Sequence, residues 1–386
     1  MPRSVWALGI TSLFMDMSSE MIHALLPVYL TGVLGLSVAS VGWIEGIAEA
    51  TAMAVKVFSG ALSDWLGKRK FLALLGYGLA ALTKPVFPLA TGAGAVIAAR
   101  FIDRVGKGIR GAPRDALVAD LVEPSMRGAA YGLRQSMDSW GAVIGPLIAV
   151  ALMLASGDNY RLVFWIAVIP AALAVATLAF GVEDAPPAQA KAAQNPLSLA
   201  AVRQFPRAFW IVTALLSLLA LARVSEAFLV LRAVDAGLAP AFAPLVLIAM
   251  GAVYAAGAFP AGLLADRLST RMLLALAILS LIASEIFLAL PGGLIPAFAG
   301  IVLWGAHLAL SQGLSATLVA ASAPAALRGT AFGLFNLAGA AMLLIGNAGF
   351  GALWAASGYT AAYAAAALTA ACALPLLALV RAEKTA

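Results

Sequence analysis

Long apolar segments follow one another along almost the whole chain, and each is long enough to cross a bilayer as a helix. The segments are continuously apolar rather than alternating over about ten residues, which favours helices over a membrane β-barrel. Hydrophobic residues make up 63% of the 386 positions and charged residues only 11%, far below the roughly 25% of a soluble domain. We therefore expect an all-α, multi-pass integral membrane protein with about twelve transmembrane helices, at about 20 residues for each helix.

The apolar segments fall into two groups of six, which a polar, proline-containing stretch separates. The first six are expected at 5–29, 38–66, 71–89, 93–122, 128–155 and 160–180. The second six are expected at 205–233, 240–265, 271–290, 293–322, 329–355 and 359–380. We predict an N-terminal six-helix bundle over residues 1–181, a linker over 182–204 and a C-terminal six-helix bundle over 205–386.

Basic residues outside the apolar segments indicate the orientation in the membrane. If the helices alternate in direction, nearly all of these residues lie on one side, including the cluster Lys68, Arg69 and Lys70. Arg161 and Arg232 lie near the other side. We expect both termini and the linker to be cytoplasmic, in the plasma membrane or bacterial inner membrane. This distribution explains the net charge of +6 without a nucleic-acid partner.

Short motifs repeat between the two halves at almost the same offset. Gly60 and Asp64 are echoed by Gly262 and Asp266, 202 residues later. The segment RGAAYGL at 127–133 is echoed by RGTAFGL at 328–334, at an offset of 201, where Gly145 also falls on Gly346. Two halves in matched register, joined on one side of the membrane, indicate parallel repeats about an axis normal to the membrane.

These motifs resemble those of the major facilitator superfamily, and the resemblance covers essentially the whole chain. The superfamily's motif between helices 2 and 3 is matched by Gly60, Asp64, Gly67 and the basic cluster, although Trp65 stands where an arginine is usual. The helix 4 motif is matched by Arg104 and Gly108, with Lys107 in the place of a glutamine.

The helix 5 motif of the proton-coupled drug-antiporter branch is matched in part. Gly141, Gly145 and Pro146 are present, but Ala149 and Val150 replace the closing glycine pair. The resemblance implies two pseudo-symmetric six-helix bundles, alternating access and, for this branch, proton-driven efflux. It also implies that a set of motif residues gates the transport cycle, together with Asp266, the repeat partner of Asp64. The motif residues are Gly60, Asp64, Gly67, Arg69, Gly141, Gly145 and Pro146.

Charged residues within the expected helices are candidates for function, because each costs about 2.5–3.5 kcal/mol to insert into a membrane. A stripe at spacings of three and four runs along the fourth helix, and we expect it to point into protein. Its members are Arg100, Asp103, Arg104, Lys107, Arg110 and Arg114. Helices 1, 2 and 5 add Asp16, Glu20 and His23, then Glu45 and Glu49, then Arg134 and Asp138.

Two interpretations of these charges stay open. In one, the cations pair with the carboxylates and only hold the N-terminal half together; in the other, at least one carboxyl binds and releases a proton during transport. The candidates for proton coupling are Asp16, Glu20, Glu45, Glu49, Asp103 and Asp138.

The expected C-terminal bundle lacks most of these charges. At the repeat offset Arg134 becomes Phe335 and Asp138 becomes Gly339, so we infer that the N-terminal half holds proton coupling and ionic substrate contacts, while the other half supplies apolar walls. The candidate substrate-binding residues are His23, Arg100, Arg104, Lys107, Arg134, Glu226, Trp304, His307, Phe332 and Asn336.

Motifs for other chemistry are missing from the sequence. It has no CxxC, no HExxH and no phosphate-binding loop, and its single cysteine, Cys372, cannot form a disulfide within the chain. We expect no enzyme activity, no metal and no cofactor, only the proton gradient as driving force. The expected partners are a small-molecule substrate and the lipid bilayer, and we expect a monomer.

Three functions are compatible with these features. The first is a proton-coupled secondary active transporter that exports a small organic molecule, such as a drug, by antiport. The second is an importer of an anionic solute such as a polycarboxylate or a siderophore, which the surplus of cations on helix 4 suggests. The third is a non-transporting receptor on a transporter fold, which the retained buried charges and the absence of a long soluble extension disfavour.

Overall fold

The computed structural model describes residues 1–183, 202, 204–324 and 327–379, and throughout these residues the chain is helical with short connections. Nine helices of the described residues are long and apolar enough to cross a membrane. In lipid, a helix satisfies its backbone hydrogen bonds within the segment, which is why uninterrupted apolar runs fold this way. The predicted linker at 182–204 lies almost entirely outside the described residues. The predicted division into two six-helix bundles stays a prediction.

The described chain separates into two compact units. Of the described residues, the first comprises 1–34, 47–183 and 240–245, and the second comprises 35–46, 202, 204–239, 246–324 and 327–379. Helix α3 (Val38–Leu66) contributes its first part to the second unit and the remainder to the first.

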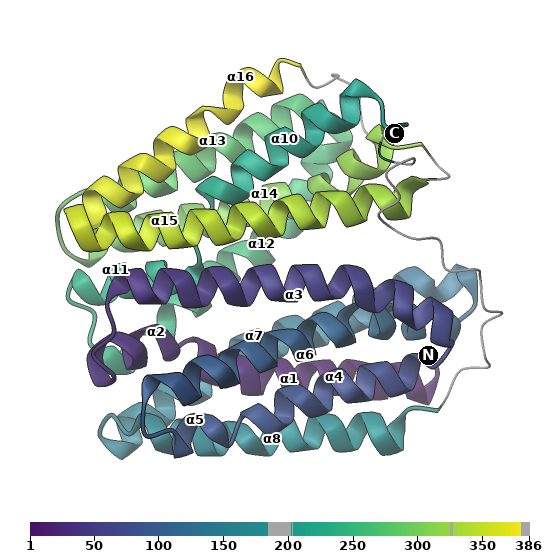
Figure 1. The fold of residues 1–386 in the computed structure, drawn as a ribbon, viewed down its shortest axis with the longest axis horizontal. Coiled ribbons are helices and arrows are strands. Elements are labelled where there is room, and N and C mark those ends of the chain that lie inside the picture. The colour runs from purple at the N-terminus through teal and green to yellow at the C-terminus, as the bar shows by residue number, and fades with distance from the viewer. Residues whose placement is uncertain (184–201, 203, 325–326, 380–386) are drawn as a thin grey trace. The chain divides into compact units, whose positions relative to one another are not determined.

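The first unit is built around five long helices and two short ones (Figure 1). They are α1 (Arg3–His23), α2 (Leu26–Val28), α4 (Arg69–Thr83), α5 (Val86–Leu89), α6 (Ala93–Asp120), α7 (Arg127–Ser156) and α8 (Tyr160–Gly181), with a π-helical turn at Tyr29–Val33 and a 3₁₀ turn at Pro124–Met126. Helix α1 packs against α7 and α8, and α4 packs against α6. A core of buried residues that includes Leu8, Tyr77, Leu117 and Leu178 joins these helices.

The second unit contains the remaining long helices (Figure 1). They are α10 (Arg207–Ala222), α11 (Glu226–Asp235), α12 (Leu245–Arg267), α13 (Thr270–Ala289), α14 (Leu294–Ser322), α15 (Arg328–Ala371) and α16 (Ala373–Leu377). A 3₁₀ turn at Pro240–Phe242 precedes α12 and belongs to the first unit. Helix α10 packs against α15, and α13 packs against α14 and α15.

Several helix boundaries differ in detail from the predicted ones, and the expected helices at 5–29 and 71–89 are each divided, after His23 and Thr83. The expected helix at 205–233 is two helices, because the backbone at Arg223 is extended (φ −75°, ψ 101°) and Ser225 caps α11 by accepting a hydrogen bond from the Ala227 amide at 3.3 Å. The expected helices at 329–355 and 359–380 meet at Gly358 of α15, where a positive φ of 81° interrupts the helical backbone. That glycine lies in the predicted gap, where a residue with a Cβ would be strained.

Paired helices approach closely at the same glycine in both units. A Cβ placed on Gly145 of α7 would lie 2.5 Å from the Met17 carbonyl oxygen of α1. A Cβ placed on Gly346 of α15 would lie 2.5 Å from the Leu221 carbonyl oxygen of α10. Glycine at these positions lets the two backbones touch, as in other membrane helix pairs. The sequence repeat is therefore also a repeat of helix packing.

Candidate functional site

The charged stripe of α6 lies mostly inside the first unit. Arg100, Asp103, Arg104 and Arg110 are between 2% and 5% exposed, as expected for a stripe that points into protein. Their spacing puts them on the face of α6 that meets the other helices of the unit. Lys107 differs from the expectation, because it is exposed.

Asp103 is held by a cation from a neighbouring helix. The Lys84 amine, just after the end of α4, lies 2.9 Å from Asp103 Oδ1 and also donates to the Ser19 hydroxyl of α1 at 3.1 Å. The Arg104 Nε lies 3.7 Å from the other carboxylate oxygen. The sequence analysis did not single out Lys84, although a lysine within an apolar run, between Thr83 and Pro85, was a signal for a buried partner.

The next carboxylate along the stripe comes from α3. The Arg104 guanidinium lies 3.2 Å from Glu49 Oε1, with Arg104 3% exposed and Glu49 33% exposed. In α1, the His23 Nδ1 lies 3.6 Å from Glu20 Oε2, one turn away on the same helix. Three of the predicted proton-coupling residues, Glu20, Glu49 and Asp103, therefore each face a basic side chain.

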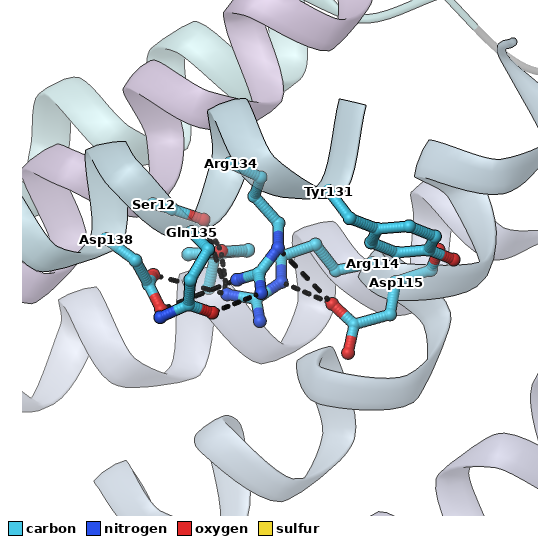
Figure 2. A network of polar contacts seen from close by, with 8 residues as sticks. Ser12, Arg114, Asp115, Tyr131, Arg134, Gln135 and Asp138 are labelled. Carbon is cyan, nitrogen blue, oxygen red and sulfur yellow. Dashed lines mark hydrogen bonds and ion pairs between the residues drawn. The ribbon is translucent and has the colours of Figure 1, made fainter. Parts of the chain in front are cut away.

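A second polar network lies further along α6 and connects it to α1, α4 and α7 (Figure 2). At its centre, the guanidinium groups of Arg114 and Arg134 share two carboxylate partners, Asp115 and Asp138. The Arg114 Nη1 lies 3.8 Å from Asp138 Oδ1, and the Arg134 Nη1 lies 3.4 Å from Asp138 Oδ2. Asp115 Oδ1 lies 3.2 Å from Arg114 Nε and 3.7 Å from Arg134 Nε.

Uncharged groups complete this network. Arg114 donates to the Ser12 hydroxyl at 3.3 Å and to the Tyr77 hydroxyl at 3.4 Å. The Tyr131 hydroxyl donates to the Asp115 carbonyl at 2.8 Å (Figure 2). Sequence reasoning did not single out Ser12, Tyr77, Asp115 and Tyr131, because a hydroxyl or an end-of-helix carboxylate carries no pattern that reveals its partner.

Asp16 meets this network from α1. A Cβ placed on Gly141 of α7 would lie 3.1 Å from the Asp16 Cβ, so the two helices are in contact at this level. The Asp16 and Asp138 side chains lie within hydrogen-bonding reach of one another. Arg110 and Lys107 are close enough to act on the Asp16 carboxyl electrostatically. Two carboxyl groups at this distance are stable together when they share a proton.

The motif residues predicted to gate the cycle are placed as follows. Gly67 has φ 64° and allows the turn between α3 and α4. Arg69 pairs with Asp120 at the end of α6 and donates to the Ala116 carbonyl at 3.1 Å. Gly60 of α3 leaves room for Ala112 of α6, whose Cβ would lie 3.4 Å from an added Cβ.

The other gating candidates lie on α7 or have side chains outside the described part of the structure. Gly141 and Gly145 form the close contact with α1, and Pro146 lies inside α7. The side chains of Asp64 and Asp266 lie outside the described residues. The gating roles stay predictions.

The second unit holds the rest of the predicted site residues. Glu45 of α3 is 1% exposed, and its Oε2 accepts a hydrogen bond from Ser225 Oγ at 3.4 Å. Trp304 and His307 of α14 are buried, and His307 Nδ1 lies 2.8 Å from the Ala277 carbonyl of α13. Glu226 at the start of α11 and Phe332 and Asn336 of α15 are half-buried.

The helices and their buried charges define the class of protein. A membrane protein with two units of repeated helix packing, and with a charged network enclosed in one of them, is built as a secondary transporter is built. The sequence model of the Major Facilitator Superfamily matches residues 8–347, and the chain belongs to that family. The resemblance inferred from the motifs is thus confirmed at the level of the superfamily.

Relatives and solved structures agree with this assignment. An uncharacterized MFS-type transporter of Methanocaldococcus jannaschii is 30% identical over 283 residues, which are 70% of this chain and 68% of that protein. The multidrug resistance protein MdtH of Proteus mirabilis is 32% identical over 133 residues, 34% of this chain and 32% of that protein. A crystal structure of a POT family transporter in complex with a thioalcohol-conjugated peptide has a TM-score of 0.82 at 14% identity, covering 98% of this chain and 95% of that chain.

Proposed function

We propose that this protein is a proton-coupled secondary active transporter that moves a small organic molecule by alternating access and exports it by antiport. The observation that carries the proposal is the contact between Asp16 of α1 and Asp138 of α7. The partial likeness to MdtH supports export of drug-like molecules. We also propose that the protein is a monomer in the plasma membrane or bacterial inner membrane and that it uses no cofactor.

The charge balance around the pair supports a coupling role. Asp138 faces Arg114 and Arg134, while Asp16 is near Arg110 and Lys107. When the pair holds one proton, its charge is −1, and when it releases that proton, the charge becomes −2 and the four cations are drawn more strongly toward it. Because Asp16 and Asp138 belong to different helices, the proton changes the force between α1 and α7. A proton is therefore able to bias one packing of the bundle over another.

The test is transport into liposomes that contain the purified protein, with and without an imposed pH gradient. Ethidium and citrate serve as cationic and anionic probes. For a transported probe, the wild-type protein should accumulate it at least tenfold more with the gradient than without. Asp16→Asn and Asp138→Asn should lose this accumulation and keep exchange of the probe at equal pH, because the carboxamide cannot bind a proton.

A matched control is Asp158→Asn, which removes an exposed carboxylate outside the network. Asp158 has φ 64°, a conformation that asparagine also adopts. This variant should accumulate the probe as the wild type does. Equal transport with and without the gradient in the wild-type protein contradicts proton coupling. If neither probe is transported, the result favours the non-transporting receptor instead.

A second candidate function, uptake of an anionic solute, is favoured by the cations that remain beside the network. The Arg110 guanidinium is 5% exposed, stacks 4.7 Å above the Tyr77 ring, and its Nη1 has no hydrogen-bond partner among the described residues. Lys107, one turn earlier on α6, is exposed. A carboxylate bound to this pair would supply a hydrogen-bond acceptor for the Arg110 Nη1.

For this function we expect Lys107→Gln to raise the KM for citrate about tenfold, as loss of one charged contact does. Lys107→Arg should keep most of the affinity, because it keeps the charge. Lys70→Gln, in the first turn of α4, is the control and should leave the KM unchanged. Citrate uptake that is identical in Lys107→Gln and the wild-type protein argues against an anionic substrate at this position.

A further inference from the structure

An apolar groove lies on the first unit between α3, α4 and α6. Its volume is about 480 Å³, within the about 300–1,000 Å³ range of small-molecule sites. We call it the α3–α4 groove. It is lined by Val55, Phe58, Ser59, Ala61, Leu62, Trp65, Leu72, Leu75 and Ile109. None of these residues belongs to the charged network.

The chemistry of the groove suits a hydrocarbon chain. Among the described residues of its lining, Ser59 is the single polar one, and its hydroxyl donates to the Gly108 carbonyl of α6 at 2.9 Å. Phe58 and Trp65 form exposed walls, at 54% and 63% exposure. An almost entirely apolar lining matches the chemistry of an acyl chain rather than that of a polar solute.

A basic loop lies at one end of the same groove. Helix α3 ends at Leu66, and the Leu72 amide, whose side chain lines the groove, donates to the Lys68 carbonyl at 3.3 Å. The groove wall therefore begins one helical turn from Lys68, which is exposed. Arg69 is occupied by Asp120 and by the Ala116 carbonyl. Lys68 and Lys70 have no ion-pair partner among the described residues.

Trp65 marks the level of the membrane surface, where tryptophan side chains are enriched. An occupant with its apolar part beside Trp65 and its charged part beside Lys68 has the shape of a lipid. Basic residues next to a membrane helix attract anionic headgroups.

We propose that the α3–α4 groove is a binding site for an anionic phospholipid of the leaflet that meets the loop at 67–70. One acyl chain lies along Leu62, Leu72 and Leu75, and the phosphate group lies between Lys68 and Lys70. The site is independent of the transported substrate and of proton coupling.

The test uses the fluorescence of Trp65 in nanodiscs with phospholipids that carry brominated acyl chains, which quench tryptophan on contact. The contribution of Trp65 is the difference between the wild-type protein and Trp65→Phe. Brominated phosphatidylglycerol should quench this contribution at a several-fold lower mole fraction than brominated phosphatidylcholine. The double variant Lys68→Gln and Lys70→Gln should be quenched equally by the two lipids.

The matched control is the double variant Arg3→Gln and Arg127→Gln, which removes the same charge from exposed positions away from the groove. It should keep the preference for phosphatidylglycerol. Equal quenching of the wild-type protein by both lipids overturns the proposal, and so does a preference that survives in the lysine double variant. Shielding of Trp65 from both lipids also overturns it, because it means that protein, such as a second copy of the chain, covers the groove.

Discussion

Asp103 and Lys84 show how single charges are accommodated within the first unit. Both side chains are almost completely buried, at 6% and 2% exposure, and their charged atoms are 2.9 Å apart. A charge that is buried without a partner is far more costly than a pair that satisfies itself. The same principle applies to Glu49 with Arg104 and to Asp138 with its two arginines. Removal of either residue of such a pair should therefore destabilise the protein, in addition to any effect on transport.

We predict that Lys84→Met lowers the free energy of unfolding by about 3 kcal/mol, because it leaves Asp103 buried beside Arg104 alone. The double variant Lys84→Met and Asp103→Leu should recover most of that loss, because no buried charge is then left without its partner. Unfolding by titration with dodecyl sulfate in mixed micelles measures both values as a double-mutant cycle.

Lys70→Met is the control for the lysine substitution, since Lys70 begins the same helix without a carboxylate partner in the described structure. It should change the stability by less than about 0.5 kcal/mol. A double variant that is as unstable as Lys84→Met alone contradicts the pairing, because it shows that the lysine stabilises the bundle in another way.

At the scale of the helices, most boundaries could be predicted from the sequence. The apolar runs predict the long helices because nothing but a helix satisfies the backbone in lipid. The predicted segments at 38–66 and 93–122 correspond closely to α3 and α6. The break between α10 and α11 was missed, because the apolar composition continues through Val224 and the N-cap signal of Ser225 and Glu226 is short.

Contacts between helices were harder to predict from the sequence than helix boundaries. The i and i+4 spacing of Asp16 and Glu20 places both on one face of α1, but it does not say which helix that face meets. In the structure Asp16 meets Asp138 of α7, while Glu20 faces His23 of α1 itself. Such pairings depend on how α1, α6 and α7 are rotated about their axes. Gly145 was the exception, because a glycine at a repeated position predicts close backbone contact.

At the scale of the whole molecule, the two units share their helix packing but not their charges. Among the described residues the second unit encloses few charged side chains, and one of them, the fully buried Arg232, donates to the carbonyls of Leu288 and Leu290 at 2.9 Å. That arginine binds α11 to the end of α13. The first unit is where the charges are concentrated, so loss of coupling and loss of ionic substrate contacts should both follow from substitutions there.

The proposed transport cycle also requires a definite topology. The nine long apolar helices include Gly329–Leu377, which Gly358 divides, while α1 and α6 are long helices with more polar sequences. Counting these helices as spans gives the proposed twelve, with both termini on the cytoplasmic side. This topology places the loop at Ser125 on the cytoplasmic side and the loop at Ala239 on the outside.

Labelling with a membrane-impermeant maleimide in intact cells tests this topology. The background is Cys372→Ala, which removes the single cysteine; Ser125→Cys and Ala239→Cys are then introduced separately at exposed loop positions. The cysteine of Ala239→Cys should be labelled in intact cells, and that of Ser125→Cys only after the cells are permeabilised, because Arg127 beside Ser125 favours the cytoplasmic side for its loop. The background protein controls for labelling elsewhere. Labelling of both cysteines from outside, or of Ser125→Cys alone, contradicts the proposed orientation and with it the direction assigned to proton-driven export.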